Sequence, residues 1–297
     1  MKRSALPVLG TAQLGLSYGV ANRVGKPEQR AATEIVKEAW QLGIREFDTA
    51  QAYGDSESTL GKALADLELS TEAKIIPNPH PDLDHKNADL ILRSLNNSLK
   101  KISIPRFFCV MLHREEMLSN WRHGVSKSVE TLVKSGLTQY IGISVYSPEK
   151  AITALKNPDF SMVQVPSNIL DRRFEEAGVF EIALDRRKTI YIRSAFLQGL
   201  ILLNPDEMPE FLSFAKITVT KLHELAQIYD VTVIEMALGY LKEMMPSAKI
   251  VFGAETSRQV KENFIAWQKG IPRQMANEIR AMFKDVDERI LNPTLWK

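Results

Sequence analysis

Polar side chains stand where each of eight short apolar stretches of this sequence ends. Acid, amide, imidazole and guanidinium groups are among them, and such groups bind ligands and exchange protons in enzymes. One polar residue after a strand is ordinary loop chemistry, whereas eight after eight strands indicate a functional site. The residues are Thr11, Ala12 and Gln13, then Asp48, Asn78, His113, Ser144, residues 164–168, Arg193 and Ser194, and residues 253–255.

Amphipathic helices alternate with the stretches that must position these side chains. Over residues 34–42 apolar residues recur at helical spacing, Gly43 suits a left-handed helix stop, and a strand follows directly. The same order recurs later, with Gly136 as the stop and residues 140–144 as the strand. Ser147 is the expected N-cap of the next helix, because serine accepts a hydrogen bond from the first helical turn.

Eight strand candidates with helical patterns between them predict an α/β fold with a parallel sheet. At 297 residues, eight units favour a single (β/α)8 TIM barrel over an open doubly wound sheet. No G-x-G-x-x-G follows the first strand, which weakens the open-sheet alternative further. We therefore expect residues 1–297 to form one barrel domain whose chemistry lies at the carboxyl ends of its strands. The candidates are residues 6–10, 44–49, 74–78, 107–113, 140–145, 161–166, 189–196 and 248–255.

Composition narrows the class of protein. The formal charge of +2 is near balance, so we expect neither nucleic acid nor an anionic membrane as a partner. The one cysteine, Cys109, lies in an apolar run and is expected to be a core residue. Without a signal-peptide pattern or an 18-residue apolar run, we expect a cytoplasmic protein. Its oligomeric state stays open.

The segment FDTAQAYGDSESTLGKAL, residues 47–64, closely resembles the strand-2 signature of the aldo-keto reductases. Similar matches lie before it at residues 9–15 and after it at residues 111–114, 141–144, 163–173, 196–202 and 251–263. The resemblance therefore covers nearly the whole chain, in order. It implies a (β/α)8 barrel that holds an extended nicotinamide cofactor, NADP or NAD, across the strand ends. It also implies an enzyme without a metal, which passes hydride between the nicotinamide and a small carbonyl, alcohol or sugar substrate.

Four residues usually perform this reaction in the family: Asp, Tyr, Lys and His. Asp48, Tyr53 and His113 fall on the matching positions. The resemblance implies that Tyr53 donates the proton, while His113 orients and polarises the carbonyl oxygen. A neighbouring ammonium, anchored by the aspartate, lowers the phenol pKa from its usual value near 10.

The ammonium is missing here, because Asn78 stands where the family has its lysine. Lys74 cannot replace it, since four positions along a strand span roughly 13 Å. A unit charge about 4 Å from the phenol is worth roughly 4 kcal/mol at an effective dielectric near 20, or about three pKa units.

Three accounts follow from this replacement. In the first, Asn78 hydrogen-bonds Asp48 or Tyr53, and the enzyme is slow or uses a different acid. In the second, Arg114 or Arg193 supplies the cation. The third is that the chain is a redox-inactive nucleotide-binding barrel that acts as a sensor or scaffold.

The remaining cofactor contacts are also implied by the resemblance. Gly10 and Thr11 lie in the matching first segment, and Ser144 and Gln164 match residues that contact the carboxamide. Arg193 takes the place of an aromatic ring that many members stack on the nicotinamide. It either pairs with a loop carboxylate or binds an anionic group of the substrate.

At the adenosine end, Glu262 and Asn263 match residues that hold the adenine. Positions that usually carry Lys or Arg for the 2′-phosphate are here Gly253, Glu255 and Gln259. A carboxylate repels a phosphate but accepts hydrogen bonds from a free ribose hydroxyl, so Glu255 predicts a weakened NADPH preference or use of NADH. Arg258 would restore a phosphate ligand if the alignment slipped by one residue.

Overall fold

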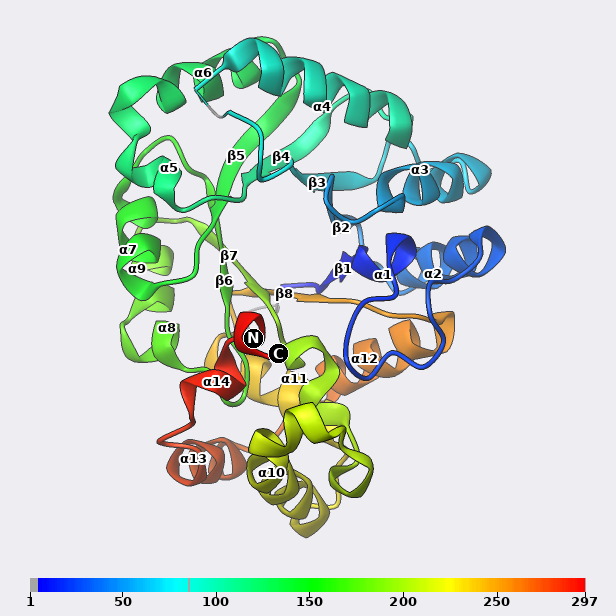
Figure 1. The fold of residues 1–297 in the computed structure, drawn as a ribbon, viewed down its shortest axis with the longest axis vertical. Coiled ribbons are helices and arrows are strands. Elements are labelled where there is room, and N and C mark those ends of the chain that lie inside the picture. Colours follow the sequence, from blue (N-terminus) through cyan, green and yellow to red (C-terminus); the bar gives the residue numbers. More distant parts are fainter. Residues whose placement is uncertain (1–4, 85, 297) are drawn as a thin grey trace.

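Eight parallel strands form a nearly closed barrel at the centre of the molecule, with helices around it (Figure 1). The computed structural model describes residues 5–84 and 86–296. The predicted (β/α)8 TIM barrel is confirmed. The strands are β1 Val8–Gly10, β2 Glu46–Ala50, β3 Lys74–Asn78, β4 Phe107–Leu112, β5 Thr138–Ser144, β6 Met162–Pro166, β7 Thr189–Arg193 and β8 Lys249–Phe252.

Strand ends differ from the prediction by a few residues, most clearly at β7. The strand was expected to run to residue 196 but ends at Arg193, because Ser194 adopts a left-handed conformation with φ 62°. The helix stops are confirmed, since Gly43 and Gly136 have φ of 91° and 73°. Ser147 caps its helix as expected, with its hydroxyl accepting from the Lys150 amide.

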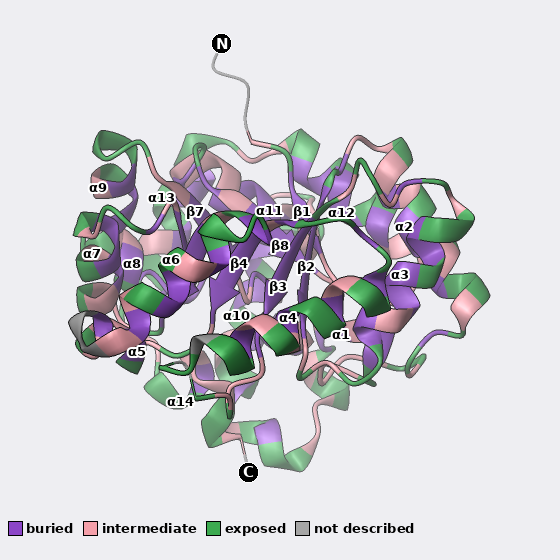
Figure 2. Cartoon of the chain, turned by 90° about the horizontal axis from the view of Figure 1, so that it is seen from above, coloured by how far each residue is buried: buried purple, intermediate pink, exposed green. Residues whose placement is uncertain are grey.

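Helices cover the outside of the barrel with their buried faces turned inward (Figure 2). The longer ones are α2 Gln29–Gln41, α3 Ser56–Asp66, α4 Ala88–Ile102, α6 Ser126–Lys134, α7 Pro148–Lys156, α9 Val179–Asp185, α10 Lys216–Ile228, α11 Val233–Met244, α12 Ser257–Lys269 and α13 Arg273–Met282. Four-residue helices occur at α1 Ala12–Gly15, α5 Glu116–Ser119, α8 Arg173–Glu176 and α14 Glu288–Leu291. In the parts of the chain described, no helix is long and apolar enough to cross a membrane.

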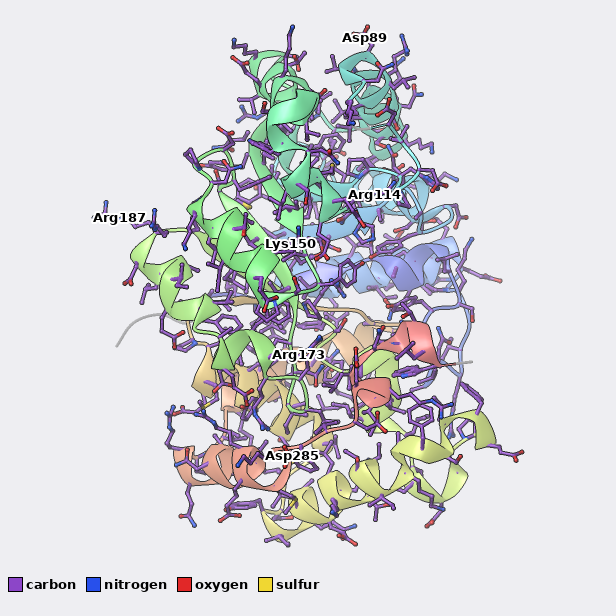
Figure 3. All side chains as sticks on the ribbon, turned by 60° about the vertical axis from the view of Figure 1, so that its left-hand side comes forward. Asp89, Arg114, Lys150, Arg173, Arg187 and Asp285 are labelled. Carbon is purple, nitrogen blue, oxygen red and sulfur yellow. The ribbon has the colours of Figure 1, made fainter. Side chains whose placement is uncertain are left out.

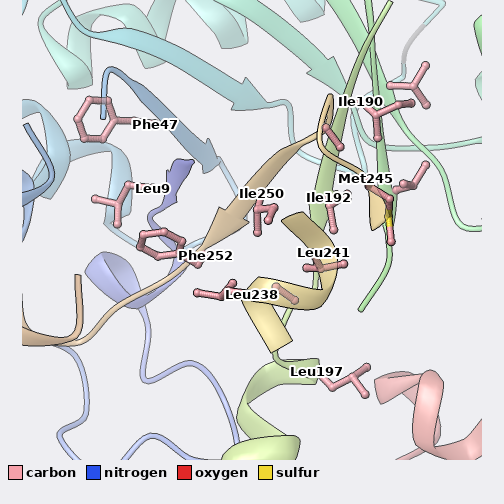
Figure 4. Close-up of a cluster of buried hydrophobic side chains, with 14 of the residues drawn as sticks. Leu9, Phe47, Ile190, Ile192, Leu197, Leu238, Leu241, Met245, Ile250 and Phe252 are labelled. Carbon is pink, nitrogen blue, oxygen red and sulfur yellow. The ribbon is translucent and has the colours of Figure 1, made fainter. Parts of the chain in front are cut away.

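Two sets of alternating strand residues build the core. One set packs against the helices, as Ile192 and Ile250 do against Leu238 and Leu241 of α11 (Figure 4). The other set points into the barrel and includes Cys109, which is buried as expected. Because strand side chains alternate, Asp48 lies on the interior side of β2, opposite in direction to its helix-facing neighbours.

The ring of strands has one seam, between β3 and β4. The sheet order is β3-β2-β1-β8-β7-β6-β5-β4, and no backbone ladder joins its two ends within the described residues. The Lys74 amide donates to the Arg45 carbonyl just before β2, and the Asn78 carbonyl accepts from the Gln51 amide just after β2. The backbone groups of Ile75 and Pro77 therefore point toward β4. Pro77 has no N–H to offer, which removes a ladder bond at this seam.

The amino-terminal floor of the barrel contains a polar trio, of which Glu46 and Tyr191 are buried and Lys249 is partly exposed. Glu46 of β2 accepts from Lys249 Nζ at 2.6 Å and from the Tyr191 hydroxyl at 2.9 Å. Tyr191 is fully buried and Glu46 is 8% exposed. Each polar group therefore has a partner, as burial of a charge requires.

Candidate active site

A cavity of about 620 Å³ opens at the carboxyl ends of the strands. Residues from the end of each strand or from the loop after it line the cavity, which is where barrel enzymes carry their chemistry. The predicted site residues that line it are Gly10, Thr11, Asp48, Tyr53, Asn78, His113, Gln164, Arg193, Gly253, Glu255, Gln259 and Asn263. Ser144 and Glu262 do not line it.

Asp48 lines this cavity at the mouth of the barrel and is 5% exposed. Gln164 reaches across the barrel and donates its amide to Asp48 Oδ2 at 2.9 Å. Burial raises the pKa of Asp48 to about 6, although the amides of Gln164 and Asn78 and the charge of Arg193 oppose the shift. An acid without a cation beside it behaves in this way when it is desolvated.

Asn78 supplies hydrogen-bonding groups but no charge. Its Nδ2 donates to the Thr49 carbonyl at 2.9 Å, while its buried Oδ1 has no hydrogen-bond partner within the described part of the chain. Lys74 lies at the other end of β3, with its Nζ 5.0 Å from the centre of the Phe108 ring. His80 lies outside the cavity lining and accepts from the Asp82 amide.

Tyr53 is held by the tight turn after β2, where its amide donates to the Ala50 carbonyl at 3.0 Å. Gly15 packs so closely on this turn that a Cβ there would lie 1.8 Å from the Tyr53 carbonyl oxygen. Burial raises the pKa of the Tyr53 phenol well above its usual value, and the negative charge of Asp48 raises it further. Arg193 lowers this pKa but does not reverse the shift.

His113 follows β4 and faces the cavity beside Tyr146, with 6.3 Å between the ring centres. Tyr146 and Tyr18 also line the cavity, although neither was predicted as a site residue. Tyr146 lies two residues past Ser144, so its place after β5 was a signal that could have identified it. Tyr18 lies in the loop after β1, and its distance from the strand end gave no comparable signal.

Arg193 lines the cavity at the end of β7. Its Nε donates to Ser144 Oγ at 3.4 Å, its Nη1 donates to Ser194 Oγ at 3.3 Å, and its Cζ lies 4.4 Å from the Tyr146 ring centre. Arg114, the other candidate cation and labelled in Figure 3, is exposed and pairs with Glu116 at 3.5 Å. It does not line the cavity. Of the two, only Arg193 influences the pKa of Tyr53 and Asp48.

The opposite end of the cavity is formed by β8 and the first turns of α12. Gln259 Oε1 accepts from the Glu255 amide at 2.7 Å, and burial raises the pKa of the Glu255 carboxyl. Arg258 points away from the cavity, because its Nε pairs with Glu262 Oε1 at 2.8 Å and its side chain is 85% exposed.

These residues fit an extended dinucleotide. The cavity runs from the ends of β3 and β4 to α12, and polar side chains stand at both ends. At Gly253 a Cβ would lie 2.1 Å from Gln13 Oε1, so a side chain there would crowd the wall.

Comparison with known proteins identifies the family of the chain. Residues 8–284 match the Aldo/keto reductase family. The chain belongs to this family. It is 26% identical over 294 residues to the L-glyceraldehyde 3-phosphate reductase of Escherichia coli (strain K12), with 87% of this chain and 83% of that protein covered. It is 25% identical over 265 residues to the aldo-keto reductase YhdN of Bacillus subtilis (strain 168), with 80% and 78% covered.

Solved structures of aldo-keto reductases share the fold of the chain. The aldo-keto reductase AKR11C1 from Bacillus halodurans, in its holo form, superposes with a TM-score of 0.77 at 21% identity, over 97% of this chain and 96% of that one. The glycerol dehydrogenase AKR11B4 from Gluconobacter oxydans gives a TM-score of 0.73 at 18% identity, over 96% and 94%. At these identities the likeness concerns the barrel alone.

Proposed function

We propose that this aldo/keto reductase is an NAD(P)H-dependent oxidoreductase that reduces a small aldehyde or ketone, or oxidises the corresponding alcohol or sugar. The observation that carries the proposal is the convergence of Asp48, Tyr53, Asn78 and His113 on one cavity at the strand ends. The three acidic or basic members match family positions, and the cavity has room for a cofactor and a small substrate.

Tyr53 and His113 act on the substrate oxygen in this proposal. A bound nicotinamide would supply the hydride. His113 orients and polarises the carbonyl oxygen, and Tyr53 gives that oxygen its proton as negative charge develops there. The raised pKa of Tyr53 keeps the proton on the phenol until this moment, which makes the transfer slow rather than impossible.

We favour the first account of the missing lysine, in which Asn78 is a hydrogen-bonding replacement in a slow enzyme. Its amide donates to Thr49 and lowers the pKa of Asp48, so it holds the strand end together without adding charge. Arg193 only partly offsets the burial of Tyr53. Arg114 does not line the cavity and is paired with Glu116.

We further propose that the enzyme has a weak preference for NADPH or uses NADH. Glu255 lines the cavity, and Arg258 is engaged with Glu262 on the surface. A ribose 2′-hydroxyl can donate to the carboxylate, whereas a 2′-phosphate would be repelled. Dissociation constants for both cofactors, from quenching of protein fluorescence, test this point. A constant for NADPH at least tenfold below that for NADH would overturn it.

Absorbance at 340 nm with NADH or NADPH and a panel of aldehydes tests the activity. The wild-type protein should oxidise the cofactor, and Tyr53→Phe should lose about 10²–10⁴-fold in rate while it still binds cofactor, because only the transferable proton is removed. Equal rates for the two proteins would contradict the role of Tyr53. Cofactor binding without turnover, in both the wild type and the Asn78→Lys variant, would support the redox-inactive sensor or scaffold instead.

A further inference from the structure

Arg193 forms no ion pair with a carboxylate among the described residues, although its charge acts at longer range on Asp48. The cavity lining contains two arginines, and one of them, Arg173, is held by Asp171 through two hydrogen bonds of 2.8 Å. Within residues 5–84 and 86–296, no carboxylate lies within ion-pair distance of Arg193. Its partners are two serine hydroxyls and the face of a tyrosine ring.

The guanidinium also has unused donors. Of its five N–H groups, one on Nε and one on Nη1 reach serine oxygens, both at more than 3.2 Å. Nη2 is buried and has no acceptor among the described residues. Arg193 is half-buried, and its buried Nη2 donor is unfavourable unless an acceptor completes its hydrogen bonds.

The backbone holds this guanidinium in place. Ser194, the next residue, is in the left-handed region at φ 62°, and Asn168 donates to its carbonyl at 3.2 Å. Strained conformations of this kind persist where the surrounding structure fixes them, often at ligand sites. Tyr146 lies over one face of the guanidinium, so a ligand oxygen would approach in the plane of the fork.

We propose that Arg193 binds an oxyanion, a carboxylate or a phosphate, on the carbonyl substrate. The substrate class is therefore oxo acids and phosphorylated aldehydes rather than neutral aldehydes. The assignment rests on the proposed function, because it places the carbonyl of the same molecule at Tyr53 and His113. The alternative that Arg193 pairs with a loop carboxylate is not supported, because its hydrogen-bond partners in the described residues are two serine hydroxyls.

Calorimetric titration with oxamate, a planar carboxylate that hydride does not readily reduce, tests this site without turnover. Oxamate should bind the wild-type protein with NADH present, and Arg193→Gln should weaken binding by roughly 30-fold or more, as for loss of one partner of a buried charge pair. Arg193→Lys should lie between the two, because the charge stays while the fork is lost. Arg114→Gln, which removes an arginine that follows a different strand, is the matched control and should bind as the wild type does.

Three results would overturn the proposal. They are equal affinity of the wild type and Arg193→Gln, equal affinity of the wild type for oxamate and neutral oxamide, and displacement of oxamate by NADH. The last would assign Arg193 to a cofactor phosphate. The oxamide comparison needs no variant, so it decides even if Arg193→Gln does not fold. Methylphosphonate in place of oxamate shows whether phosphate-type anions are bound as well.

The outcome is separate from that of the proposed function. Oxamate binding that depends on Arg193 supports the anion site even in a protein that oxidises no cofactor. Turnover of neutral aldehydes without oxamate binding would instead support the oxidoreductase and reject the anion site.

Discussion

The two ends of the barrel hold similar groups in opposite states. At the floor, Glu46 of β2 has both Lys249 and Tyr191 as close partners. At the mouth, two residues further along the same strand, Asp48 has a tyrosine nearby in the cavity but only the amides of Gln164 and Asn78 beside it. Burial is nearly equal, with Glu46 8% and Asp48 5% exposed. The difference is that the carboxylate, ammonium and phenol at the floor satisfy one another, whereas Asp48 at the mouth has no ammonium beside it and borders the cavity.

Removal of Lys249 should have the largest effect, because it would make the floor resemble the mouth. Lys249→Met leaves Glu46 as a buried carboxylate without its cation, which should lower the free energy of unfolding by about 3–5 kcal/mol. Urea denaturation measures the change. Lys134→Met, at an exposed pair with Glu130, is the control and should leave the urea midpoint almost unchanged. A small effect of Lys249→Met would mean that the floor trio does not stabilise the barrel.

The reverse exchange adds a cation to the mouth. Asn78→Lys should increase the reduction rate up to several hundredfold, because an ammonium about 4 Å from the phenol is worth roughly 4 kcal/mol. The measurement is kcat at 340 nm over a range of pH, where the added charge should also move the phenol titration downward. Asn78→Met is the matched control of similar length without charge, and it should show no gain. An equal gain in both variants would locate the effect in packing rather than in charge.

The pH dependence of stability gives a smaller test of the same contrast. Asp48 has a folded-state pKa of about 6, above its unfolded value near 4, so the folded protein binds this proton more tightly. Its contribution to stability is present below pH 4 and is lost as the pH rises to 6. Relative to Asp48→Asn, the wild type should lose roughly 3 kcal/mol across this window. Asp55 is a control of opposite sign, because Lys26 lowers the pKa of its carboxyl. If the free energy of unfolding changed with pH in the same way for the wild type and Asp48→Asn, the raised pKa would be contradicted.

Most of the fold could be predicted because its signals are local. Strand and helix patterns alternate along the chain, and the stops at Gly43 and Gly136 follow from residue type. The site was predictable as far as parallel strands bring their ends together, which placed Asp48, Asn78 and His113 on one cavity. Side-chain partners were not, since the hydrogen bond from Gln164 to Asp48 joins residues 116 positions apart. The Tyr146 ring over Arg193 depends in the same way on loop conformation, which no local pattern specifies.

The seam at Pro77 predicts where the barrel opens locally at the lowest cost. A ring closed by ladders on every side must break a full set of backbone bonds before any strand can separate, whereas this ring has one boundary where a donor is absent. Local opening should therefore be least costly between β3 and β4, and the amides of these strands should exchange with deuterium before those of β6 and β7. Asn78 is the last residue of β3, at the active-site end of that boundary. The residue that replaces the lysine therefore lies where we expect the wall of the active site to open locally at the lowest cost.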